Sequence, residues 1–246
     1  MAEAQPRARG PVRKILAALV WVAALATLLS LGTWQVQRLA WKEKLLADIS
    51  ERRTEEPVTL EAIEAMERTG GDIEYRPLSV TGTFDHDKER HFLATWNGQS
   101  GYHVYTPLLL ADGRYVFINR GFAPFEKKEA RTRGEGQIAG GQTLSGLARE
   151  KLDGKPSSLV PDNDISKNVF YWKDLDAMAA STGIAPANLV PFFIDADSAT
   201  NPGGLPVGGV TQFEMPNNHL QYALTWYGLA LAMVGVSGVY IWRARR

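Results

Sequence analysis

The sequence predicts a membrane protein of the α+β class, in which two transmembrane helices bracket an antiparallel β-rich domain with short helices. Residues 15–34 and 220–242 contain no Asp, Glu, Lys or Arg, although the 246-residue chain holds 54 such residues. These two runs predict the spans. Between them, from residue 78 onward, β-branched and aromatic residues gather in short runs separated by turn residues, which predicts the strands.

The first run, residues 15–34, is twenty residues long, and at about 1.5 Å per residue it matches a hydrocarbon layer of roughly 30 Å. A cleavable signal peptide is the alternative, because Ser30-Leu31-Gly32 has small residues at cleavage spacing. The run exceeds the about 7 to 15 apolar residues of a signal core, which favours a span. Aromatic residues typical of membrane interfaces flank or interrupt both runs: Trp21, Trp34, Trp41, Trp226, Tyr227, Tyr240 and Trp242.

Basic residues predict the orientation of the spans. Four lie before the first span and three after the second, whereas residues 174–219 contain none, so we expect residues 1–14 and 243–246 to be cytoplasmic tails. Lys and Arg residues just beyond the first span are a weaker, competing signal. Fourteen residues are too few for an ordinary mitochondrial presequence and linker, so the expected location is a bacterial cytoplasmic (inner) membrane, with residues 35–219 in the periplasm.

The composition of the predicted periplasmic domain excludes several functions. Its 20 basic and 26 acidic residues give a formal charge of −6, which argues against nucleic acid as a partner. The absence of cysteine excludes disulfides, thiolate metal sites and covalent c-type haem attachment.

Local patterns predict the elements of this domain in order. The first span continues as a helix through residues 35–49, and a short helix over residues 60–68 begins at Thr59. The expected strands are antiparallel, with turns that include Asn97-Gly98 and Asp112-Gly113, and cover residues 78–84, 91–96, 102–106, 115–119, 144–149 and 192–195. A further helix is expected over residues 174–181, and the polar, Gly-rich residues 126–141 are expected to form a mobile loop.

Three motifs that often carry chemistry lack their usual context. Gly134 to Ala139 match G-x-G-x-x-A but follow a charged segment and not a strand, and the elbow-like Gly98 to Gly101 fails at Tyr102. His86 and His91, with neighbouring aspartates, could hold a metal, but their spacing places them on opposite faces of a strand and favours a solvated turn.

Two arginines lie at strand margins. Arg76 and Arg120 could clamp carboxylates, although structural ion pairs are favoured.

His219 lies where the chain enters the second span and, at helical spacing, shares a face with Tyr222 and Trp226. An imidazole beside aromatic rings at the membrane surface could ligate the iron of a flat hydrophobic macrocycle, which makes these residues the candidate cofactor site. The alternative is an interfacial histidine that caps the helix.

Small residues on the two spans predict that the spans pack closely against each other. They are Gly228, Ala232 and Gly235 on the second span and Ala17, Ala18, Ala24 and Ala26 on the first.

Several segments resemble the Surfeit-locus-one family of membrane assembly factors for haem-copper cytochrome c oxidase. The resemblance covers roughly residues 30–246 and includes the two-span layout. Its motifs are Gly32-Thr33-Trp34-Gln35 with Gln37-Arg38-Leu39 and Trp41-Lys42, Tyr75-Arg76-Pro77, Gly82 with Phe84, Gly101-Tyr102 with Val104 and Thr106-Pro107-Leu108, Asn119-Arg120-Gly121 with Pro124, and Asn218-His219-Leu220 with Tyr222-Ala223 and Thr225-Trp226-Tyr227.

The resemblance implies a non-enzymatic chaperone of respiratory-chain biogenesis that assists the delivery of haem a to oxidase subunit I, or its retention there. The family's proposed haem-binding positions fall on His219 and Trp226, with haem a held transiently and its iron on His219. Subunit I is the implied partner, with haem a synthase as a further one. The alternative is a haem-independent membrane scaffold that stabilises subunit I. No catalytic constellation can be assembled from the sequence to support an enzyme.

Overall fold

The computed structural model describes residues 10–211, 213 and 217–246. The chain divides into two compact units, a helical unit of Met1–Asp48 with Phe213–Arg246 and a β-rich unit of Ile49–Gln212. Residues 1–9 of the predicted cytoplasmic tail lie outside the described residues.

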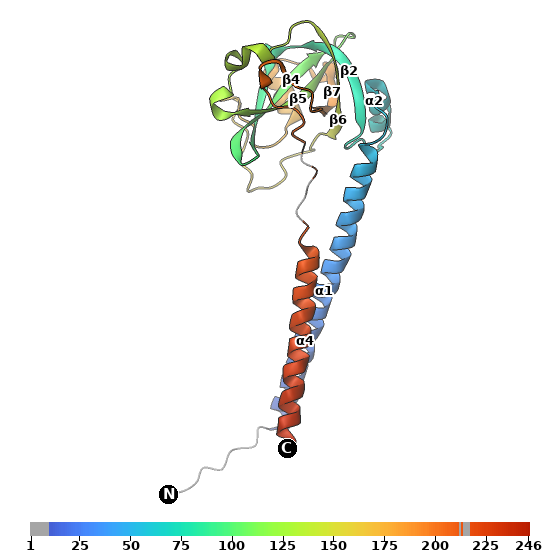
Figure 1. Cartoon of the computed structure of the whole chain (residues 1–246), viewed down its shortest axis with the longest axis vertical. Helices are drawn as coiled ribbons and strands as arrows, with labels where there is room; N and C mark the ends of the chain where they lie inside the picture. Colours follow the sequence, from blue (N-terminus) through green and yellow to red (C-terminus); the bar gives the residue numbers. More distant parts are fainter. Residues whose placement is uncertain (1–9, 212, 214–216) are drawn as a thin grey trace. The chain divides into compact units, whose positions relative to one another are not determined.

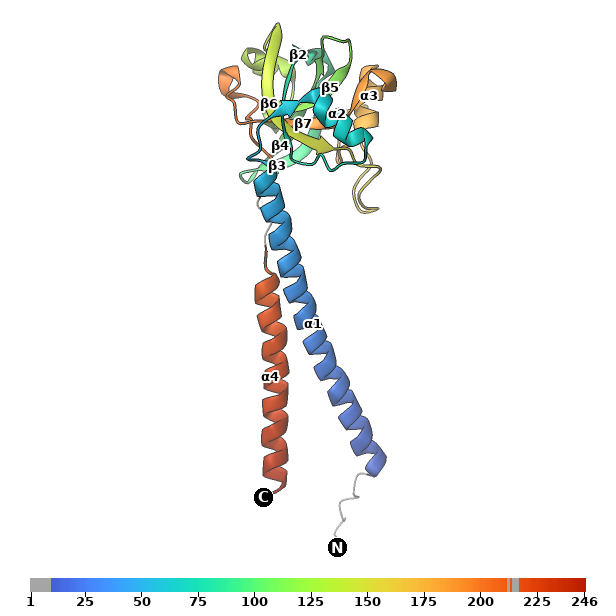
Figure 2. The same ribbon diagram turned by 90° about the vertical axis from the view of Figure 1, so that its right-hand side faces the viewer.

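The helical unit consists of α1 (Pro11–Arg52), whose last turn belongs to the β-rich unit, and α4 (His219–Ala244). Both are long and apolar enough to cross a membrane. Figure 2 shows each as one continuous helix. Because α1 continues to Arg52, the predicted extension of the first apolar helix through residue 49 is confirmed. No Pro or Gly interrupts the helical pattern after Gly32, which explains why the helix continues.

The β-rich unit contains one seven-stranded sheet in the order β1-β2-β6-β7-β5-β4-β3. Its strands are β1 (Val58–Thr59), β2 (Pro77–Phe84), β3 (Arg90–Trp96), β4 (Gln99–Leu109), β5 (Tyr115–Pro124), β6 (Gly141–Glu150) and β7 (Leu189–Ala196). A further pairing of β2 with β4 closes five strands into a barrel, the architecture of the OB-fold (Figure 1). The prediction of antiparallel strands holds except where β1 pairs with β2 and β5 with β7, which are parallel.

Alternate residues of the barrel strands fill two apolar layers. Inward residues such as Leu108, Ile118 and Ile194 form one core with Leu60 and Ile63 of α2 (Leu60–Arg68). Outward residues such as Tyr105, Phe117 and Phe193 form a second core with Leu175 and Met178 of α3 (Leu175–Thr182). The barrel is therefore packed on both sides of this part of its wall.

Local signals placed several boundaries correctly. The Thr59 hydroxyl accepts a hydrogen bond from the Ala62 N–H at the start of α2, as the predicted cap requires. The Asp112-Gly113 turn joins β4 to β5, with Gly113 at φ 85°.

The expectation of a mobile loop over residues 126–141 is wrong. This segment contains the 3-10 helices η2 (Phe125–Lys127) and η3 (Ala130–Gly136), and Arg133 and Gly136 are buried. A Cβ on Gly136 would lie 2.1 Å from the Leu205 carbonyl oxygen, so the segment packs closely against the chain there. Polar composition did not reveal this order, because the anchoring side chain is itself an arginine.

Candidate functional site

His219 is the first residue of α4 and is partly buried. Its Nδ1 lies 2.7 Å from Oε1 of Gln35 on α1, and Gln35 is only 8% exposed. An amide oxygen can only accept a hydrogen bond, so Nδ1 donates to it, and in the neutral tautomer Nε2 keeps its lone pair. This is the arrangement that orients histidines that bind metals, in which one nitrogen is held by a neighbour and the other is free to ligate.

Tyr222 and Trp226 lie one and two turns further along α4. Tyr222 is 54% exposed, whereas Trp226 is partly buried on the side of α4 that packs against α1. The predicted trio therefore lies along one flank of the first two turns of α4, with the phenol ring outermost.

The contact between α1 and α4 follows a regular seven-residue spacing. Shielded residues recur at alternating steps of three and four, as in two helices packed side by side. On α1 they include Trp21, Leu25, Leu28, Gly32, Gln35 and Leu39, and on α4 they are His219, Ala223, Trp226, Ala230, Met233 and Ser237.

Polar side chains connect the two helices at both ends of this contact. Trp21 Nε1 donates to Ser237 Oγ at 2.8 Å, and the hydroxyls of Thr33 and Tyr227 lie 3.1 Å apart. Together with the Gln35–His219 bond, these contacts fix the register of one helix against the other.

The predicted role of the small residues on α4 is wrong. Gly228, Ala232 and Gly235 are exposed, and a Cβ on Gly228 or Gly235 would meet no atom within 4 Å. Close approach occurs instead at Gly32, where an added Cβ would lie 2.8 Å from the Tyr227 ring. The sequence did not identify the face of α4 that contacts α1, because small residues occur on more than one side of α4.

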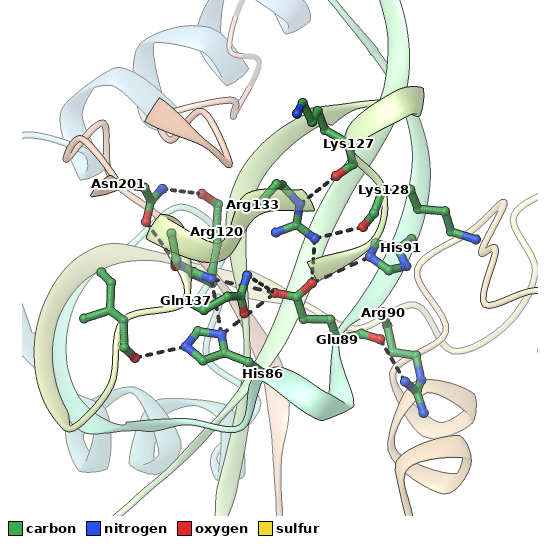
Figure 3. Close-up of polar contacts among 12 residues, drawn as sticks. His86, Glu89, Arg90, His91, Arg120, Lys127, Lys128, Arg133, Gln137 and Asn201 are labelled. Carbon is green, nitrogen blue, oxygen red and sulfur yellow. Dashed lines mark hydrogen bonds and ion pairs between the residues drawn. The ribbon is translucent and has the colours of Figure 1, made fainter. Parts of the chain in front are cut away.

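A second cluster of functional interest lies in the β-rich unit, around the buried carboxylate of Glu89 (Figure 3). Arg133 of η3 donates from Nη2 to Glu89 Oε2 at 2.6 Å, and both residues are 4% exposed. Arg133 also donates to the carbonyl oxygens of Lys127 and Lys128. The prediction of a solvated turn at residues 85–91 therefore holds only in part: Asp87 in the 3-10 helix η1 (His86–Lys88) is exposed, whereas Glu89 and His91 are buried. No local pattern pairs Glu89 with a residue 44 positions away.

His86 and His91 both approach Glu89 and do not point to opposite faces of a strand. His86 Nε2 donates to the Ile138 carbonyl oxygen at 3.0 Å, and His86 Nδ1 lies 3.4 Å from Arg120 Nη1 and 3.8 Å from Glu89 Oε1. His91 Nε2 lies 3.7 Å from Glu89 Oε2. Within the described residues no group of three His, Asp or Glu side chains is arranged to hold a metal ion.

Arg120 of β5 is 2% exposed and lies at the edge of the Glu89 cluster. Its Nη2 donates to the Gly136 carbonyl oxygen and to Asn201 Oδ1, while Nη1 is 3.8 Å from Glu89 Oε1. Burial lowers the pKa of Arg120 to about 10. Burial alone would raise the pKa of Glu89, but its interactions with His86, His91 and Arg133 hold that pKa well below the ordinary value.

The favoured interpretation of Arg76 and Arg120 as members of structural ion pairs is confirmed for both: Arg76 pairs with Glu55 at 2.7 Å, and Arg120 pairs with Glu89 at 3.8 Å. A further buried carboxylate, Asp195, accepts from Arg149 at 2.6 Å and from Asn119 at 2.8 Å. Burial opposes its charge, but Lys173 and Arg149 hold the pKa of Asp195 below its ordinary value.

Comparison with known proteins agrees with the motifs. A model of the SURF1 family matches residues 22–231 of the chain. Surfeit locus protein 1 of Mus musculus is 42% identical over 224 residues, which cover 84% of this chain and 70% of the relative. The Homo sapiens protein of that name is 41% identical over 234 residues, covering 87% of this chain and 74% of the relative. A SURF1-like protein of Drosophila melanogaster is 33% identical over 238 residues, covering 88% and 75%. The chain therefore belongs to the SURF1 family.

Proposed function

We propose that this chain is a membrane-anchored, non-enzymatic assembly factor for haem-copper cytochrome c oxidase. It assists the delivery of haem a to subunit I or the retention of haem a there. Membership of the SURF1 family supports the assignment to oxidase assembly. Haem a is the cargo, subunit I is the recipient, and haem a synthase is the donor.

In this proposal α1 and α4 anchor the chain in a bacterial cytoplasmic membrane. Residues 15–34 and 220–242 cross the bilayer, and the cationic ends of the chain support a cytoplasmic location of both tails. Residues 35–219 are then periplasmic, and His219 lies at the outer membrane surface.

The observation that carries the proposal is the hydrogen bond between Gln35 and His219. Within the described residues Nε2 of His219 has no hydrogen-bond partner and can ligate the haem iron, and the bond to Gln35 holds the imidazole in one orientation. The exposed ring of Tyr222 and the partly buried ring of Trp226 offer apolar surface to the macrocycle from the same flank of α4. The residues present therefore fit a haem held through one axial nitrogen.

A haem-independent scaffold is the second candidate, because one face of α4 has no neighbour within the described residues. Gly228, Ala232 and Gly235 form an exposed stripe, and small residues of this kind allow transmembrane helices to approach closely. In this role α4 would hold a helix of subunit I and never contact haem.

Co-expression with haem a synthesis separates the two candidates. The carrier proposal predicts that the detergent-solubilised chain purifies with haem a and shows a Soret band, which His219→Ala abolishes. Gln221→Ala, an exposed polar side chain in the same helical turn, is the matched control and should keep the band. If the wild-type protein purifies without haem and still captures subunit I, the carrier proposal is contradicted and the scaffold proposal is favoured.

A further inference from the structure

We propose that a cavity beside Arg120 in the β-rich unit binds a small organic carboxylate, which neutralises the buried guanidinium. The cavity has a volume of about 220 Å³ and opens where the ends of β2, β6 and β7 meet the segment after β7. Six residues define its character: Arg120, Phe84, Ile138, Leu144, Ala196 and Asn201. It lies entirely within the β-rich unit, so the proposal is independent of the haem site.

The first argument is the charge balance of the Glu89 cluster. Two guanidinium groups, those of Arg120 and Arg133, share the single carboxylate of Glu89. Arg133 holds the carboxylate at 2.6 Å, whereas Arg120 is 3.8 Å from it. Buried charges are stable only when they are paired, so the excess positive charge lies on Arg120.

The second argument is the set of donors that Arg120 has left. Its Nη2 group bonds Gly136 and Asn201, and its Nη1 group reaches His86 and Glu89. Within the described residues Nε has no hydrogen-bond partner. Arg120 thus lines the cavity with one N–H donor and a positive charge still available to an anion.

The lining of the cavity indicates the class of anion. Phe84, whose ring centre is 4.8 Å from Arg120 Cζ, combines with Ile138 and Leu144 to give apolar walls beside the guanidinium. Asp197 also lines the cavity, and its Oδ1 accepts the Ala199 N–H, but within the described residues it makes no hydrogen bond or ion pair with Arg120. A volume of about 220 Å³ equals that of roughly seven water molecules at about 30 Å³ each, so only a small anion fits. A monocarboxylate with a short alkyl chain fits this size and this mixed surface.

The test is a thermal unfolding titration of the full chain in detergent with butyrate as the probe, at constant ionic strength. We expect a saturable rise of the unfolding midpoint, because a ligand that binds only the folded state stabilises it. Butyramide, which has the same shape without the charge, is the matched control and should produce no rise. An equal rise with butyramide, or none with butyrate, overturns the proposal. A rise of the unfolding midpoint with inorganic phosphate but not with butyrate also overturns the proposal.

Two variants locate the binding site. Ala196→Leu fills the cavity without touching the Glu89 cluster and should abolish the butyrate effect while the chain stays folded. Arg120→Gln should abolish it as well, but it removes a buried contact and can prevent folding, so Ala196→Leu decides the result. An undiminished butyrate effect in folded Ala196→Leu places the anion elsewhere and contradicts the proposal.

Discussion

At the scale of single residues, the Glu89 carboxylate stabilises the packing of three segments. It joins Arg133 of η3 and Arg120 of β5 to the segment before β3, although all three side chains are nearly excluded from water. Losing one member of a buried ion pair is costly because the remaining charge cannot be solvated.

Glu89→Gln should therefore lower the free energy of unfolding by about 3 to 5 kcal/mol. The measurement is denaturant unfolding of the detergent-solubilised chain, followed by the β-strand circular dichroism signal. Asp162→Asn is the control, because Asp162 pairs with Lys155 at the surface and its loss should change stability by under about 1 kcal/mol. Equal effects of the two substitutions would show that Glu89 does not stabilise the fold.

His103 makes the stability of the β-rich unit depend on pH. Burial, with a smaller contribution from Lys173, lowers the pKa of His103 from 6.5 to about 4, against the opposing effect of Asp195. Between these two values the unfolded chain takes up a proton that the folded chain does not, so stability should fall as the pH drops from 6.5 toward 4. Unfolding measured across this window should show a smaller slope for His103→Gln, and an unchanged slope would contradict the assignment.

The sequence could reveal residues whose role depends on nearby positions, and it missed those whose partners are distant. Thr59 was identified as a helix cap because its partner is three residues away. The Glu89–Arg133 pair was missed because its members are 44 positions apart, residues 126–141 show only polarity, and the burial of an arginine depends on the tertiary fold. His219 was found from its position, but the Gln35 partner on the other helix was not.

At the scale of elements, α1 and α4 pack against each other, and their closest approach at a glycine is at Gly32. A side chain at Gly32 would collide with the Tyr227 ring, whereas Gly235 faces open space. The sequence predicted both helices from composition, but the contact face could not be predicted, because it depends on the rotation of each helix about its axis.

Gly32→Ala should therefore disturb the pairing of the two helices, while Gly235→Ala, the same chemical change, should not. The measurement is the pulsed EPR distance distribution between spin labels at Leu19 and Val239, which are both exposed. The absence of native cysteine makes such labelling specific. A distribution that broadens equally in both variants, or in neither, would contradict the assigned contact.

At the scale of the whole molecule, the proposed orientation follows from the cations at the two ends of the chain. A fluorescent protein fused after Arg246 should fold and fluoresce in the cytoplasm. Alkaline phosphatase inserted at Leu159, which is 92% exposed, should be active in the periplasm. The reverse pattern would place the β-rich unit in the cytoplasm and remove the proposed function.

The most direct test of the assigned role is the haem a content of cytochrome c oxidase purified from cells that lack this chain. The proposal predicts oxidase deficient in haem a and in activity, restored by the wild-type gene and by Gln221→Ala but not by His219→Ala. Oxidase with normal haem a content and activity in the deleted cells would contradict it.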